Sequence, residues 1–107
     1  QALEIAKERR AQDRETTAYL GLGDIYRLNN QFETAIKNYE QALEIAKERR
    51  AQDRETTACL ELGDVYTLNN QFETAIKYYE EALEIAKERK DQDQKTTAYL
   101  NLGQAHR

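Results

Sequence analysis

Apolar and small residues recur at every third or fourth position over most of the chain, a spacing typical of a helix with one buried face. In residues 15–28, for example, Tyr19, Leu22, Gly23 and Tyr26 stand at i, i+3, i+4 and i+7. These side chains would share one face of an α-helix. The pattern therefore predicts a first kind of helix, which we call helix A.

A second and longer helix, helix B, is predicted to follow over residues 31–51. Between the two helices stands Asn29-Asn30, and asparagine tolerates the left-handed conformation that often ends a helix. Because this connection is only a few residues long, helices A and B are expected to pack as an antiparallel hairpin. The apolar positions of helix B keep the helical spacing for about four turns: Phe32, Ala35, Ile36, Tyr39, Leu43 and Ala46.

The same hairpin is then repeated. Residues 1–40 and 41–80 align without a gap, and a third copy starts at Glu81 and runs to Arg107, so the period is forty residues. A single hairpin of this size cannot bury both of its apolar faces, so successive hairpins must stack on one another. The first two copies differ at five positions: Tyr19/Cys59, Gly21/Glu61, Ile25/Val65, Arg27/Thr67 and Asn38/Tyr78.

Applied to the whole chain, the repeat predicts an all-α fold of alternating B and A helices. The absence of proline and the presence of only four glycines leave long segments free to stay helical. Asp13 and Asp53 are expected to cap the A helices that follow them. The predicted order is a partial helix B (1–12), repeat 1 (15–51, with A at 15–28 and B at 31–51), repeat 2 (55–91, with A at 55–68 and B at 71–91) and helix A of a truncated repeat 3 (95–107).

The residues at fixed places in each hairpin resemble the tetratricopeptide repeat. The first copy carries Leu22-Gly23, Tyr26, Ala35, Tyr39 and Ala42, and the second carries the same types forty residues later. This resemblance implies a right-handed superhelical solenoid and a protein-interaction scaffold that is not an enzyme. HEAT and armadillo arrays have similar periods but lack the Leu-Gly-x-x-Tyr pattern. The period exceeds the usual thirty-four residues and the closing proline is missing, which indicates a longer helix B and resembles the repeats of G-protein-signalling modulators and bacterial multi-repeat proteins.

Members of this family usually bind an extended peptide or a partner's helix in a concave groove lined by helix A. Positions that hairpin packing leaves free form a stripe along each A helix, and its aspartates would favour a basic peptide. The alternative, that these are ordinary solvated side chains, stays open. The candidate groove residues are Thr17, Leu20, Asp24, Arg27, Thr57, Leu60, Asp64, Thr67, Thr97, Leu100 and Gln104.

Charge and composition argue against several other functions. The formal net charge of -4 is unlike the basic surface of nucleic-acid-binding proteins, and no segment is apolar and long enough for a membrane span. The sequence has no serine, no cluster with metal-ligand spacing and no glycine-rich phosphate loop. We therefore expect no catalytic residue, no metal and no cofactor.

Two unique residues are interpreted as packing residues. Cys59 stands where the other copies have tyrosine and is predicted to be a small buried hydrophobic residue, and His106 replaces a tyrosine near the end of the sequence. A single cysteine cannot form an internal disulfide, which favours a reducing, cytoplasmic location.

Self-association is the alternative function. The first and last predicted helices each present an apolar face that would meet a neighbouring hairpin in a longer array, and uncapped solenoids tend to associate. Near-identical copies also favour exchange of helices between chains. The sequence therefore predicts either a peptide-binding scaffold or a structural module that self-associates through its uncapped repeat ends, as a head-to-tail or helix-swapped oligomer.

Overall fold

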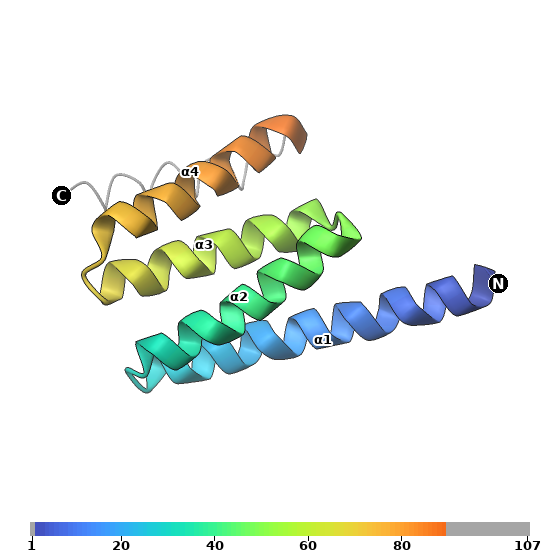
Figure 1. The fold of residues 1–107 in the computed structure, drawn as a ribbon, viewed down its shortest axis with the longest axis horizontal. Helices are drawn as coiled ribbons and strands as arrows, with labels where there is room; N and C mark the ends of the chain where they lie inside the picture. The colour runs from blue at the N-terminus through green and yellow to red at the C-terminus, as the bar shows by residue number, and fades with distance from the viewer. Residues whose placement is uncertain (1, 90–107) are drawn as a thin grey trace.

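The computed structural model describes residues 2–89 as four α-helices joined by short connections (Figure 1). Each helix runs antiparallel to the one before it and packs against its neighbours in chain order, so that α2 lies between α1 and α3. The all-α hairpin stack predicted from the sequence is thus confirmed for this part of the chain. The helices are α1 (Ala2–Leu28), α2 (Phe32–Arg49), α3 (Gln52–Leu68) and α4 (Phe72–Arg89).

The turns that follow α1 and α3 have the geometry expected of their asparagines. Asn30 and Asn70 both have φ 62°, in the left-handed region. In the first turn the Asn30 N–H donates to the Arg27 carbonyl and the Gln31 N–H donates to the Tyr26 carbonyl, at 3.0 and 2.8 Å. This pair of bonds satisfies carbonyl groups at the end of the helix and fixes the direction in which α2 leaves.

The predicted break between the partial helix B at 1–12 and the helix A at 15–28 is wrong. α1 is one continuous helix of 27 residues, and Asp13 lies inside it instead of capping a new helix. The second capping prediction is also wrong, because α3 starts at Gln52 after Ala51, and Asp53 falls in its first turn. Asp13 instead forms ion pairs with Arg49 and with Arg54. The helix expected at 95–107 lies outside the described residues.

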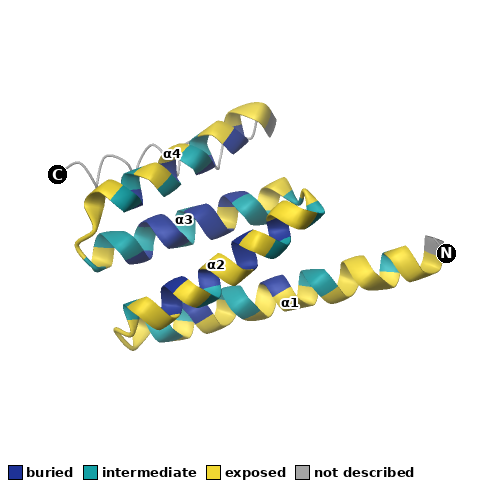
Figure 2. Ribbon diagram, viewed as in Figure 1, coloured by how far each residue is buried: buried dark blue, intermediate teal, exposed yellow. Residues whose placement is uncertain are grey.

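The core lies along α2, α3 and the facing side of α4, whereas the first half of α1 is largely exposed (Figure 2). Tyr39 and Tyr79 are the largest fully buried side chains, and each packs on the glycine of the preceding helix. A Cβ at Gly23 would come within 2.4 Å of the Tyr39 ring, and one at Gly63 within 2.3 Å of the Tyr79 ring. Only glycine allows this close approach, which sets the register of helix A on helix B.

Candidate peptide-binding groove

Each buried tyrosine also donates a hydrogen bond from its hydroxyl to an aspartate on the surface of helix A. The Tyr39 hydroxyl donates to Asp24 Oδ1 at 2.6 Å, and the Tyr79 hydroxyl donates to Asp64 Oδ1 at 2.5 Å. The contact with glycine fixes the position of each tyrosine ring. The hydroxyl then reaches the aspartate that directly follows that glycine on helix A. The two aspartates of the predicted stripe are therefore held in fixed, equivalent positions in the two repeats.

Four charged side chains from α1 and α3 meet at this level, and we call them the carboxylate cluster: Asp24, Arg27, Glu61 and Asp64. The Arg27 guanidinium is central. It lies 3.1 Å from Glu61, 3.6 Å from Asp24 and 4.0 Å from Asp64. Three carboxyl groups thus surround a single cation, which leaves an excess of negative charge where the two repeats join.

The pKa values of the three carboxyl groups in the cluster are shifted in different directions. Burial, together with a hydrogen bond and repulsion from Asp24, raises the pKa of Glu61 to about 7. Burial also disfavours the charged form of Asp24, but hydrogen bonds with Glu61 and Tyr39 and the charge of Arg27 outweigh it and lower its pKa. Burial raises the pKa of Asp64 despite its bond from Tyr79 and the nearby Arg27. Near neutral pH, Glu61 therefore holds a proton part of the time.

Three threonines of the stripe lie within the described residues; they are exposed or half-buried, and each is hydrogen-bonded to its own helix. The Thr17, Thr57 and Thr67 hydroxyls donate to backbone carbonyls four residues earlier, at 2.8–3.0 Å. This local bond uses the hydroxyl proton but leaves the oxygen free to accept a hydrogen bond.

The leucines Leu20 and Leu60 are half-buried and pack against the core instead of standing free as rungs for a ligand. Thr97, Leu100 and Gln104 lie outside the described residues. The charged residues of the stripe therefore lie close together on the surface, whereas its described leucines pack on the core.

Sequence reasoning missed two parts of this site, the Glu61 carboxyl and the tyrosine hydroxyls. A signal for Glu61 was present: Arg27 and Glu61 both stand at positions where the two copies differ, as Arg27/Thr67 and Gly21/Glu61. In near-identical repeats, a pair of differences with opposite charge suggests a contact between the copies. The structure shows this contact.

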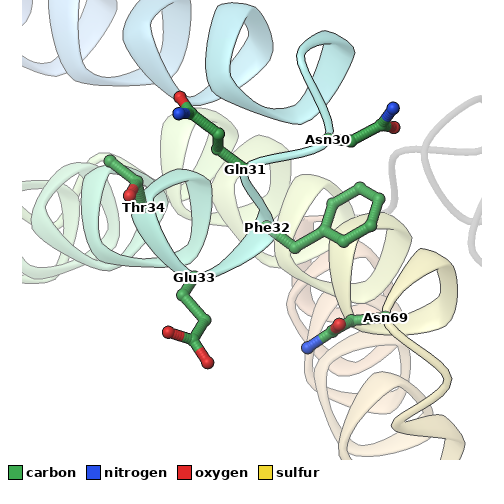
Figure 3. Close-up of a pocket in the computed structure, with 6 residues that line it drawn as sticks. All are labelled: Asn30, Gln31, Phe32, Glu33, Thr34 and Asn69. Carbon is green, nitrogen blue, oxygen red and sulfur yellow. The ribbon is translucent and has the colours of Figure 1, made fainter.

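An open hollow lies beside the start of α2, close to the end of α3 (Figure 3). In this view the Phe32 ring lies between the side chains of Asn30 and Asn69, and the Glu33 carboxylate points away from it. A similar hollow occurs one repeat later, at residues 70–74. Both are lined by amide groups, one threonine, one glutamate and one phenylalanine ring. The first is lined by Asn30, Gln31, Phe32, Glu33, Thr34 and Asn69.

Cys59 is fully buried in the core, as the sequence predicts, and burial raises the pKa of its thiol. Such a thiol is a packing residue and a poor nucleophile. Within residues 2–89, no group of three or more His, Cys, Asp or Glu side chains is arranged to hold a metal ion. No helix in the same range is long and apolar enough to cross a membrane. His106 lies outside the described residues.

The fold and the cluster define a class of protein: a solenoid of helical hairpins with a charged surface where two repeats join. The chain belongs to the tetratricopeptide repeat family, whose model matches residues 1–48 and 53–107. The fold class expected from the motif residues is thereby confirmed. Repeats of this family generally mediate protein–protein interaction or scaffolding and are generally not enzymes.

A solved structure agrees with this assignment. The chain is similar to BtubC (BKLC) from P. vanneervenii, with 28% sequence identity and a TM-score of 0.79. The similarity covers 89% of this chain and 39% of that protein, so the present chain corresponds to well under half of it. No curated protein sequence matches the chain significantly.

Proposed function

We propose that the chain is a protein-interaction scaffold that binds an extended, basic peptide segment along the face formed by α1 and α3. The observation that carries this proposal is the carboxylate cluster, in which three carboxyl groups share the single guanidinium of Arg27. A lysine or arginine of a ligand would supply the missing positive charge. Asp24 and Asp64 are partly exposed and retain lone pairs that their tyrosine bonds do not use.

The geometry favours a peptide over a small molecule. The two aspartates repeat at equivalent positions on successive A helices, and the exposed Thr17 and Thr57 lie two turns before them on the same helices. Equivalent groups on successive repeats suit a linear ligand, because each repeat can contact the next segment of the chain. Charge complementarity would mainly set the rate of association and the choice of partner.

The test is a titration with two fluorescent ten-residue peptides, one containing alternating lysine and threonine and one with glutamate in place of lysine. We expect the lysine peptide to bind more tightly, and increasing salt to weaken that binding. Asp24→Asn and Asp64→Asn remove charge while keeping an oxygen that accepts the tyrosine hydrogen bond. Together they should weaken binding of the lysine peptide about tenfold or more, the effect of losing two charge contacts.

Glu44→Gln is the matched control, because Glu44 is exposed on α2, away from the cluster. It removes one negative charge from the protein and should leave peptide binding nearly unchanged. Equal binding of the two peptides, or an equal effect of the control and the cluster variants, would contradict the proposal. Self-association remains the alternative function, and a cytoplasmic location stays a prediction.

A further inference from the structure

One sequence of 18 residues occurs twice in the chain and has two different structures. Residues 1–18 and 41–58 are identical. In the second copy the helix ends at Arg49, Arg50 takes the left-handed conformation with φ 56°, and a new helix starts at Gln52. In the first copy the corresponding Arg10 lies within the continuous helix α1. The same junction is thus closed as a hairpin in one copy and open as a straight helix in the other.

One apolar face of α1 is exposed. Leu3 is 64% exposed, whereas its copy Leu43 is 6% exposed, and Ile25 is 63% exposed, whereas its counterpart Val65 is fully buried. Ala18 and Leu22 are also exposed, although their copies Ala58 and Leu62 are fully buried. At about 100° per residue, the four exposed residues fall within an arc of about 100°. They therefore lie on one side of the helix, which we call the open face: Leu3, Ala18, Leu22 and Ile25.

The second copy shows what normally covers such a face. The four corresponding residues of α2 and α3 belong to a single core cluster, in which α2 packs on α3. Leu3 and Leu22 cannot meet in the same way within one straight helix, because nineteen residues separate them by about 28 Å. The segment around Leu3 can therefore pack on a segment around Leu22 in two ways: within one molecule if the junction closes, or between two molecules if it stays open.

We propose that two copies of this chain pair through antiparallel α1 helices, with residues 1–9 of each packing on residues 13–21 of the other. Each intermolecular contact would repeat the contact that α2 makes with α3. The arrangement is symmetric, with its two-fold axis near Ala11, whose exposed and small side chain permits close approach. This inference deepens the self-association alternative and is independent of peptide binding.

The first measurement is the molar mass by light scattering after size exclusion, over a hundredfold range of protein concentration. We expect a mass that rises from 12.5 kDa toward twice that value. Leu3→Lys places a charge on the open face at a site already exposed in the monomer, so the monomer should keep its helix content. It should raise the dimer dissociation constant more than about tenfold, because the contact would bury the new charge twice, once on each side of the two-fold axis.

Leu28→Lys is the matched control. Leu28 is exposed, and so is its copy Leu68, so this position is not part of the contact that the hairpin buries. It should leave the dissociation constant nearly unchanged. Arg10→Gly is a second probe, because glycine adopts the left-handed conformation readily and favours the closed junction. Arg10→Gly should therefore reduce dimer formation, although it adds no charge to the open face.

The mode of pairing is tested by oxidation of the Ala11→Cys variant. Two cysteines near the two-fold axis should form a disulfide-linked dimer, whereas Lys37→Cys, exposed on α2, should not, and the native Cys59 is buried. A monomer at every concentration would overturn both self-association and this proposal. A dimer that is indifferent to Leu3→Lys, or that is not linked through position 11, would leave self-association standing but overturn pairing through α1.

Discussion

Replacing Gly63 with alanine tests the contact that sets the packing of helix A on helix B. The added Cβ would lie 2.3 Å from Cε1 and 2.5 Å from Cδ1 of the Tyr79 ring, where unstrained carbon atoms stay about 3.5 Å or more apart. The ring cannot move aside easily, because it is buried and its hydroxyl is bonded to Asp64 at 2.5 Å. We expect the overpacking to cost about 1–3 kcal/mol. The better helix propensity of alanine offsets up to about 1 kcal/mol of that loss.

The chain provides its own control for the propensity effect. Gly21 also lies inside a helix, but a Cβ there would meet nothing within 4 Å. Gly21→Ala should therefore raise the free energy of unfolding by about 0.5–1 kcal/mol. Thermal unfolding followed by far-UV circular dichroism should separate the two variants clearly, because 1 kcal/mol shifts Tm by about 4–8 °C in a domain of this size. If Gly63→Ala proved as stable as Gly21→Ala, the tight Gly–Tyr contact would not constrain the repeat.

Three further predictions follow from the cluster and the core. The pKa of Glu61 is raised from 4.5 to about 7, so the stability that its proton provides is complete below about pH 4.5 and is lost as pH rises through about 7. Urea unfolding between about pH 5 and 8 should show a loss of about 1–2 kcal/mol that Glu61→Gln removes, and equal pH profiles would refute the assignment. Tyr39→Phe deletes the hydrogen bond to Asp24 and should cost about 1 kcal/mol in the same assay, and a neutral effect would contradict the value of that bond. Cys59 should react with a thiol reagent at least about a hundredfold more slowly in the native protein than in denaturant, and fast native labelling would show that its helices open readily.

Much of the fold could be predicted from the sequence, because each element is specified locally. The spacing of apolar residues predicts the helices, the Asn29-Asn30 pair predicts the left-handed turn, and Gly23 predicts the place where two helices approach most closely. Asparagine tolerates the left-handed conformation of the turn, and glycine allows the close approach of the two helices. The repeat then extends the same prediction along the chain.

The candidate site was predicted only in part, because its geometry depends on contacts between repeats. Asp24 and Asp64 were identified from their positions on helix A. Their partners were not, because the Tyr39 hydroxyl reaches Asp24 from another helix and Glu61 reaches Arg27 from the next repeat. Helical periodicity describes which residues share a face, but it does not describe which faces meet.

The junction at residues 10–12 shows why local sequence alone could not give the helix boundaries. An 18-residue sequence is straight in α1 and broken at Arg50, so sequence within this window does not decide between the two forms. A non-glycine residue in the left-handed conformation costs roughly 1–2 kcal/mol, which favours the straight form. Burial of a leucine such as Leu43 contributes about 1.5–3 kcal/mol, which favours the closed form wherever a partner face is available. The two forms are therefore close in free energy, and the neighbouring helix, whether from the same chain or from a second copy, determines which one is adopted.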